Sequence, residues 1–250
     1  MRGLFVTGTD TDVGKTVLSA ALLAAIGAGD GGEPVAAHKP AVTGLDEPPD
    51  GTGGVPWPAD HELLGAAAGM SPEQVAPLRF GPAVSPLLAG ELAGERPRRE
   101  QLLAAGQEAL RDAEQREATL IVEGVGGLLS PLAEDFTVCD LAASLRLPLL
   151  IAARPGLGTI NHSLLTLQSA RAAGLDVRAI VLTPWPKQPS PLEQSNRESI
   201  RRLGFVEVDT LARARGPELK ELARVGAELP WRRWLDERPA ARPDPASTSA

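Results

Sequence analysis

Residues 8–16 near the N-terminus, GTDTDVGKT, combine the residue types that bind phosphate. They follow an apolar run that predicts a strand and precede a run that predicts a helix, so backbone N–H groups and the helix N-terminus can form an anion cradle. Lys15 would add a positive charge at the outer phosphates, and the Thr16 hydroxyl could complete the shell of a Mg²⁺ ion. The sequence predicts a nucleotide-binding phosphate loop. Its expected binding residues are Asp12, Val13, Gly14, Lys15 and Thr16.

The start of this loop departs from the usual phosphate-loop pattern. Gly8 lies one residue further from Gly14 than the pattern has it, and Thr9 stands at the standard glycine position. The loop is therefore a variant. The alternative is an ordinary strand-to-helix turn with an incidental Gly-Lys-Thr, which the placement between an expected strand and an expected helix disfavours.

Three more charged residues lie at the ends of expected elements. Lys39 ends the second expected strand, Glu123 ends the third, and Asp60 opens an expected helix. The carboxyl ends of parallel strands share one edge of a sheet, where ligands gather. Each residue also has a structural alternative: Asp60 as a helix N-cap, Lys39 as a strand-end lysine whose amine reaches solvent, and Glu123 as an ion-pair partner.

The alternation of short apolar runs with longer helical patterns predicts βαβ units and a parallel sheet. Six expected strands are apolar on both faces, as strands covered by helices must be. They span residues 3–8, 34–39, 118–123, 147–153, 177–183 and 204–208. With right-handed crossovers, this order gives an α/β fold with a doubly wound, mainly parallel sheet of the P-loop NTPase type.

Capping signals mark several of the helices between these strands. Residues 190–193 (Ser-Pro-Leu-Glu) predict a capping box that opens a helix, and Gly204 is expected at the C′ position of that helix. Residues 137–140 repeat the box. Further helices are expected over residues 101–116 and from about 159 to 174.

Length and composition predict one globular domain. The chain has 250 residues, of which 43% are hydrophobic and 23% charged, and we expect the domain to span residues 1–234. Residues 235–250, rich in Pro, Ala and Arg, are expected to form a flexible tail. Residues 45–58, with four Pro and three Gly, are expected to form a mobile loop.

Charge and cysteine content exclude several partner classes. A net charge of -7 with 3% aromatic residues disfavours nucleic-acid binding, which uses basic surfaces and stacking aromatics. Cys139, the single cysteine, cannot form an intramolecular disulfide, and no Cys/His cluster indicates zinc. No apolar stretch is long enough to span a bilayer, and the N-terminus lacks a signal-peptide core. We expect a cytoplasmic protein that binds neither nucleic acid nor membrane.

Five segments, taken in order, make the chain resemble the dethiobiotin synthetase family. They are residues 8–16, His-Lys-Pro at 38–40 with Thr-Gly at 43–44, the expected helix from Asp60 to Ala-Gly at 68–69, Glu-Gly-Val-Gly-Gly at 123–127, and Leu-Gly-Thr-Ile-Asn-His at 157–162. The resemblance implies a Mg²⁺-dependent ligase of biotin biosynthesis. Such an enzyme closes the ureido ring of dethiobiotin from 7,8-diaminononanoate, CO2 or bicarbonate and a nucleoside triphosphate such as ATP, through a carbamate and a mixed carbamic-phosphoric anhydride.

The resemblance also assigns roles to residues at matching positions. Lys15, Lys39 and Thr11 match catalytic positions; a carbamate that attacks a γ-phosphate brings negative charges together, and cations offset them. Thr16, Asp60 and Glu123 match the positions that supply Mg²⁺ ligands, and hard oxygens suit that ion. The expected substrate-binding residues are Thr43, Glu123, Gly126, Gly158, Thr159, Ile160 and Asn161.

The resemblance further implies a homodimer with the site at the subunit interface. In the family, the substrate carboxylate reaches the N-terminus of a helix in the partner subunit, and residues 158–161 match that helix start. Helix N-termini suit carboxylates.

Three positions depart from the family pattern. Asp12 stands where Glu is common, and Gly156 where some members carry Lys. At the end of the fifth expected strand, members that read adenine often present Asn, whereas this chain has a Thr-Pro-Trp-Pro segment that offers fewer hydrogen-bonding groups. We expect loose selection of the nucleotide base there. The expected base-contacting residues are Thr183, Pro184 and Trp185.

Two other protein classes share the loop. A partition-type switch ATPase usually carries a second lysine inside the phosphate loop, and residues 9–13 contain none. A ligase that forms amides on a tetrapyrrole normally has a glutamine-hydrolysing domain, for which this chain has no spare length. The switch ATPase remains the alternative to the ligase.

Overall fold

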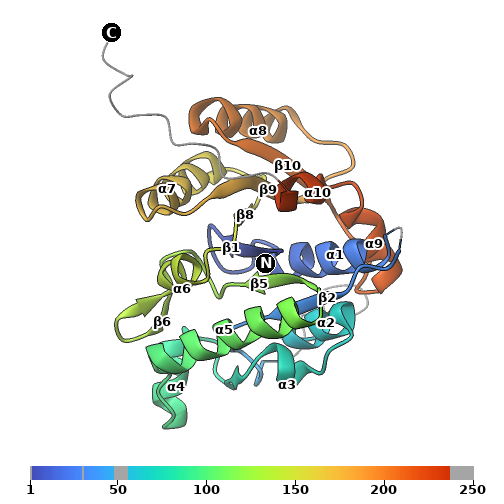
Figure 1. Ribbon diagram of the computed structural model, residues 1–250. Helices are drawn as coiled ribbons and strands as arrows, with labels where there is room; N and C mark the ends of the chain where they lie inside the picture. Colours follow the sequence, from blue (N-terminus) through green and yellow to red (C-terminus); the bar gives the residue numbers. More distant parts are fainter. Residues whose placement is uncertain (1, 30, 48–55, 237–250) are drawn as a thin grey trace.

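A computed structural model describes residues 2–29, 31–47 and 56–236. Six parallel strands form the central sheet in the order β10-β9-β8-β1-β5-β2 (Figure 1). The strands are β1 (Gly3–Gly8), β2 (Val35–His38), β5 (Thr119–Glu123), β8 (Leu149–Ala153), β9 (Val177–Trp185) and β10 (Glu207–Ala212). From β1 the chain runs to the edge strand β2, returns to β5 between them, and then adds β8, β9 and β10 on the other side of β1. The expected doubly wound α/β fold is therefore confirmed.

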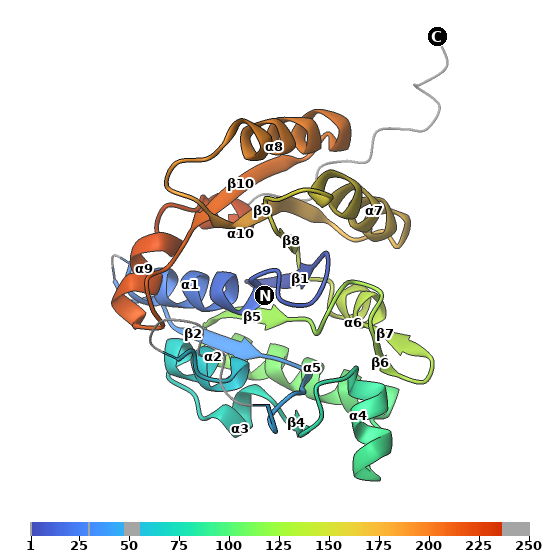
Figure 2. The same ribbon diagram turned by 180° about the vertical axis from the view of Figure 1, so that it is seen from behind.

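Helices cover both faces of this sheet. Leu4 and Val6 of β1 join one hydrophobic core and Phe5 joins the other, because successive side chains of a strand point to opposite faces. The first face is covered by α1 (Lys15–Gly27), α2 (Asp60–Ala68), α9 (Leu219–Gly226) and α10 (Trp231–Asp236) (Figure 2). The second is covered by α5 (Arg99–Gln115), α6 (Val138–Leu145), α7 (Thr159–Ala172) and α8 (Pro191–Gly204). None of the described helices is long and apolar enough to cross a membrane.

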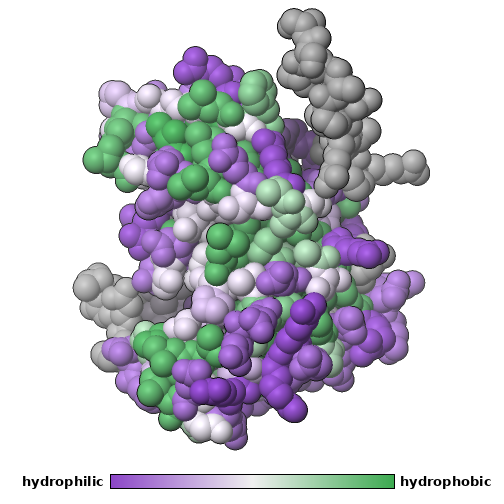
Figure 3. Space-filling model, turned by 90° about the vertical axis from the view of Figure 1, so that its left-hand side faces the viewer, coloured by the Kyte–Doolittle hydropathy of each residue, from purple (hydrophilic) through white to green (hydrophobic). Residues whose placement is uncertain are grey.

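Smaller elements lie beside the central sheet. β3 (Ala41–Val42) pairs in parallel with β4 (Leu78–Arg79), and β6 (Pro131–Ala133) pairs antiparallel with β7 (Phe136–Thr137). The two short helices are α3 (Pro72–Val75) and α4 (Pro86–Ala93). Figure 3 views the molecule from the side that holds α4 and α7, and apolar areas interrupt its polar surface. Large apolar side chains exposed on α4, on α7 and in the loops are Leu88, Leu92, Leu129, Leu157 and Leu165.

Both expected capping boxes are present, but the end of α8 differs from the expectation. Ser190 and Glu193 exchange side-chain and main-chain hydrogen bonds at the start of α8. The box at the start of α6 has the same form. Gly204 is the last helical residue, and Phe205 (φ 46°) takes the left-handed position after it. A Cβ on Gly204 would lie 2.9 Å from Leu167 Cδ2, so this glycine packs closely on α7.

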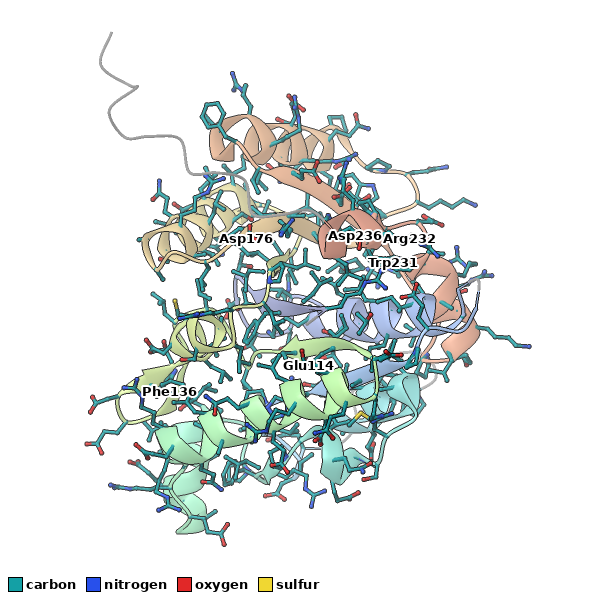
Figure 4. The ribbon with its side chains drawn as sticks, viewed as in Figure 1. Glu114, Phe136, Asp176, Trp231, Arg232 and Asp236 are labelled. Carbon is teal, nitrogen blue, oxygen red and sulfur yellow. The ribbon has the colours of Figure 1, made fainter. Side chains whose placement is uncertain are left out.

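Two boundaries near the C-terminus also correct the sequence-based expectation. β10 begins at Glu207, not at residue 204, because α8 continues through Gly204. Leu235 and Asp236, expected in the tail, belong to α10, and Figure 4 labels Asp236 on this helix. Leu235 packs on the core, and Asp236 forms an ion pair with Arg2 (Nη2 to Oδ1, 3.7 Å). The rest of the expected tail and residues 48–55 of the expected loop lie outside the described residues.

Two main-chain donors at the outer edge of β2 have acceptors. Ala37 N–H donates to Met70 Sδ at 3.3 Å, and Lys39 N–H, directly after the strand, donates to Val75 O at 2.9 Å. Sheet edges otherwise present free N–H and C=O groups. The segment from α2 to α3 therefore covers part of this edge of the sheet.

Candidate functional site

The expected phosphate loop connects β1 to α1 at the carboxyl edge of the sheet. Gly14 (φ 89°) directly precedes α1, and no side chain of the described residues caps that helix, which leaves its first N–H groups to a ligand. A Cβ on Gly8 would lie 2.7 Å from Val13 Cγ2 and 2.9 Å from Asp10 O, because the loop folds back over this residue. Only glycine fits there. A loop of this form before an uncapped helix can bind a polyphosphate.

Lys15 directs its amine at the loop. Its Nζ donates to Asp10 O at 2.8 Å, and the residue is 6% exposed. Burial, reinforced by repulsion from Lys39, lowers the pKa of Lys15 to about 8. Phosphates bound at the loop would favour the charged amine again, because an opposite charge nearby raises the pKa of a lysine.

Lys39, Asp60 and Glu123 meet in one cluster beside the first turn of α1. Lys39 Nζ lies 2.5 Å from Glu123 Oε1 and 2.8 Å from Asp60 Oδ2. Thr16 Oγ1 donates to Glu123 Oε1 at 2.8 Å. The cluster forms because β5 lies between β1 and β2 in the sheet, so the ends of β2 and β5 open beside the phosphate loop. The structure thus brings together one expected lysine and all three residues expected to bind Mg²⁺.

The structure decides between the alternatives for these residues. Ala59 is the N-cap of α2 and Asp60 is its first helical residue, so Asp60 does not cap the helix, and its carboxylate binds Lys39 instead. Lys39 is 3% exposed, so its amine does not reach solvent. Glu123 is fully buried and is an ion-pair partner, as its structural alternative expects.

Opposite charges favour the ionised forms of Lys39 and Asp60. Burial alone would lower the pKa of Lys39, but Asp60 and Glu123 outweigh it and raise that pKa above its usual value. Burial alone would raise the pKa of Asp60, but Lys39 outweighs it and lowers that pKa. At the adjacent His38, burial acts alone and lowers the pKa to about 4.

The cluster offers the ligand types that Mg²⁺ prefers. Asp60 and Glu123 supply carboxylate oxygens and Thr16 supplies a hydroxyl, and Mg²⁺ takes hard oxygens together with several waters. Glu123 Oε2 is buried and has no hydrogen-bond partner among the described residues, so a cation would satisfy it. The described residues contain no group of three or more His, Cys, Asp or Glu placed for a metal ion. A metal here would therefore depend on the hydroxyl and on phosphate or water oxygens.

The glycine segment after β5 runs beside the phosphate loop. A Cβ on Gly126 (φ 64°) would lie 3.7 Å from Thr11 Oγ1 and 2.5 Å from Ser130 Oγ. Gly124 has another reason to be glycine, because its Cβ would lie 2.7 Å from Val138 Cγ1 in the core. Thr43 follows β3 and is half-buried, and within the described part of the chain its side chain forms no hydrogen bond.

The expected base-contacting residues extend β9 beyond its expected end. The strand continues through Thr183 and Pro184, which are joined by a cis peptide bond, to Trp185. A Cβ on Gly14 would lie 2.9 Å from Thr183 Cγ2, so the buried Thr183 packs directly on the phosphate loop. Pro184 and Trp185 are half-buried. This segment is thus positioned beside the loop where a nucleotide would lie.

The start of α7 holds the other expected substrate-binding residues. Gly158 (φ 88°) is the N-cap, Thr159 is buried, Ile160 is half-buried and Asn161 is exposed. Thr159 N–H donates to Gly156 O at 3.3 Å, so this donor is already used. The first-turn donors that remain for a carboxylate are the N–H groups of Ile160 and Asn161.

Two residues at the site escaped the sequence analysis. Arg154, directly after β8, donates from Nε and Nη2 to Asp12 O at 3.0 and 2.9 Å. Asn196 of α8 is buried and donates from Nδ2 to Pro155 O at 2.9 Å and Gly156 O at 3.0 Å. Both bind main-chain carbonyls, which no residue pattern reveals. The only signal available was their position: Arg154 follows a buried strand whose end shares the edge with the phosphate loop.

Comparison with known proteins agrees with this site. A family model described as an AAA domain matches residues 2–237. The ATP-dependent dethiobiotin synthetase of Mycobacterium avium (strain 104) is 37% identical over 238 residues, covering 94% of this chain and 98% of that protein. The enzyme of the same name from Anaeromyxobacter dehalogenans (strain 2CP-1) is 42% identical over 210 residues, covering 83% and 87%. That from Bacillus subtilis (strain 168) is 38% identical over 206 residues, covering 81% and 83%. The chain belongs to the ATP-dependent dethiobiotin synthetase family.

Proposed function

We propose that this protein is an ATP-dependent dethiobiotin synthetase of biotin biosynthesis. It would use Mg²⁺ and close the ureido ring from 7,8-diaminononanoate, CO2 and ATP. The observation that carries the proposal is a buried lysine on the phosphate loop, Lys15, beside a second buried lysine, Lys39, that binds two carboxylates. The family to which the chain belongs supports the same activity.

The reaction needs cations because negative groups must approach one another. One amine of the diamine adds to CO2 and gives a carbamate, whose oxygen attacks the γ-phosphorus while the bond to ADP breaks. The second amine then attacks the carbonyl carbon of the mixed anhydride, loses a proton and expels phosphate. Lys15 and Lys39 would hold the phosphate and carbamate oxygens at attacking distance, and the loop N–H groups of residues 12–16 would hold the outer phosphates.

Lys39 would change partners when the substrates bind. In the structure its amine is held by Glu123 and Asp60. Mg²⁺, held by Thr16, Asp60 and Glu123, would neutralise charge on the phosphates. With the carboxylates engaged in this way, the Lys39 amine becomes available to the carbamate.

Smaller groups would complete the site. Thr11 and Gly126 lie side by side at the loop and would contact the reacting oxygens. Thr43 and Glu123 would contact the diamine. Asp12 keeps the charge of the Glu common in the family with a shorter reach. The segment from Thr183 to Trp185 would bind the base weakly.

The substrate carboxylate would be bound across a homodimer interface. Residues 158–161 start α7, and the N–H groups of Ile160 and Asn161 would bind the carboxylate there, because a helix N-terminus suits that group. Leu157 next to them is 92% exposed and Leu92 of α4 is 64% exposed, so this side of the monomer leaves apolar surface for a second copy to cover. The enzyme would act in the cytoplasm.

A turnover assay tests the proposal. We expect dethiobiotin and phosphate to form only when the diamine, bicarbonate, ATP and Mg²⁺ are all present, and Lys15→Ala to abolish both products. The alternative is a partition-type switch ATPase. Steady phosphate release that does not depend on the diamine would favour the switch and overturn the ligase.

A further inference from the structure

Arg154 forms a fixed contact on an exposed part of the site. Both Nε and Nη2 donate to one acceptor, the carbonyl of Asp12, at 3.0 and 2.9 Å, although the two residues are far apart in the sequence. A long exposed side chain normally keeps much of its rotamer freedom. A planar fork with two donors on one carbonyl limits that freedom and fixes the direction of the carbonyl.

The direction of the Asp12 carbonyl determines the direction of a phosphate-loop donor. A trans peptide is planar, so the Asp12 C=O and the Val13 N–H point to opposite sides of the same unit. Asp12 has φ 53°, in the left-handed region that few non-glycine residues adopt and that Asp adopts more readily than most. The Val13 N–H has no acceptor among the described residues. The carbonyl thus faces the guanidinium, and the N–H stays available on the loop side.

The base of Arg154 is itself held in place. Asn196 Nδ2, on a residue 5% exposed, binds both Pro155 O and Gly156 O, the two carbonyls that follow Arg154. The preceding residue, Ala153, is the last of β8 and is fully buried. Arg154 therefore extends from a segment held by hydrogen bonds, and its guanidinium can fix the position of the Asp12 carbonyl in the phosphate loop.

We propose that Arg154 is a positioning residue that orients the Asp12–Val13 peptide so that the Val13 N–H binds nucleotide phosphate. The guanidinium acts through the loop backbone and does not touch the reacting atoms. The proposal rests on the proposed function only in that a nucleotide binds this loop. Because the effect is on a phosphate donor, it extends to inorganic tripolyphosphate, which has no base or ribose.

Calorimetric titration of Arg154 variants tests this role. We expect Arg154→Ala to raise the Kd for Mg·ATP and for tripolyphosphate about tenfold alike. Arg154→Lys keeps the charge but not the fork, so it should recover only part of that loss. Arg111→Ala, an exposed arginine on α5, is the matched control and should bind as wild type. In turnover, Arg154→Ala should raise KM for ATP while kcat stays within about twofold, because the loss is in binding.

Two results would overturn the role of Arg154. Wild-type Kd values in a folded Arg154→Ala protein would show that the loop holds its shape alone. Wild-type Kd values in Arg154→Lys would show that the positive charge is sufficient and that the two-donor geometry of arginine is not needed. If wild-type protein binds Mg·ATP but makes no dethiobiotin, the proposed function fails while the binding comparison still decides the role of Arg154.

Discussion

The two sides of the phosphate loop are built from different contacts. On the side of β2 and β5, side chains bind side chains: Lys39 lies between Asp60 and Glu123, and the cluster is largely buried. On the side of β8, side chains bind main-chain carbonyls: Arg154 holds Asp12, and Asn196 holds residues 155–156. The first arrangement concentrates charge where chemistry needs it. The second gives the backbone its shape and leaves the charges at the surface.

The largest effect is expected from the buried side. Lys39→Ala should lower turnover roughly 100-fold or more, because it removes a preorganised cation. It should also lower the free energy of unfolding by about 3 kcal/mol, since it leaves the buried Glu123 without a cation. Kinetics and urea unfolding measure the two losses.

Lys15→Ala is the matched control for that stability loss. Lys15→Ala should lower turnover as strongly as Lys39→Ala does. Its free energy of unfolding should change by less than about 1 kcal/mol, because the Lys15 amine binds a main-chain carbonyl and not a carboxylate. Equal losses in the free energy of unfolding for the two variants would contradict the interpretation that Lys39 stabilises the buried Glu123 through an ion pair.

A second effect comes from His38, whose pKa is shifted by burial alone, whereas the pKa values of Lys39 and Asp60 are also shifted by opposite charges. The pKa of His38 is about 4 in the folded protein and 6.5 ordinarily, so between these values the unfolded chain binds a proton that the folded protein does not. The free energy of unfolding should therefore fall by about 3 kcal/mol as the pH is lowered from 6.5 to 4. The difference between wild type and His38→Gln in urea titrations over this range isolates the contribution. His162→Gln, at an exposed histidine, should keep the wild-type slope.

A third effect tests the oxygen ligands of the same cluster. Asp60→Asn should raise the Mg²⁺ concentration for half-maximal turnover about tenfold or more, because it removes a carboxylate from the metal shell. A magnesium titration measures the shift. Glu62→Gln is the control, because this acid lies two residues later in α2 and its carboxylate accepts a hydrogen bond from Ala59 N–H. This variant should leave the magnesium requirement unchanged. An unchanged magnesium requirement in Asp60→Asn would show that Asp60 is not a metal ligand.

The smallest effect is expected where the nucleotide base would lie. Thr183 and Pro184 present few polar groups, and pockets with apolar walls discriminate weakly. Dethiobiotin formation with ATP, GTP, CTP and UTP should therefore differ by about tenfold or less. Strict dependence on ATP would mean that other groups read adenine.

The sequence predicted the central sheet well because its strands are apolar on both faces and are separated by strong turn and cap signals. The missed boundaries have local causes. Gly204 resembles a helix terminator, but Leu167 packs against its backbone, and the left-handed residue is Phe205. α10 extends to Asp236 through packing and an ion pair with Arg2, which composition does not reveal.

The charged cluster beside β2 and β5 was predicted from the sequence, whereas the main-chain contacts beside β8 were not. Lys39, Asp60 and Glu123 were expected because they match positions of the family that the chain resembles and because charged residues at strand and helix ends are visible in the sequence. Arg154 and Asn196 were not, because their partners are main-chain carbonyls placed by the fold. The roles of the expected residues toward the substrates remain predictions.

Two occupied donors at the edge of β2 affect how copies of this chain can associate. Ala37 and Lys39 give their outward N–H groups to Met70 and Val75, so a strand from a second molecule finds those donors already taken. Strand addition at these positions would cost hydrogen bonds that the chain already makes, which favours helix and loop surfaces for contact between copies.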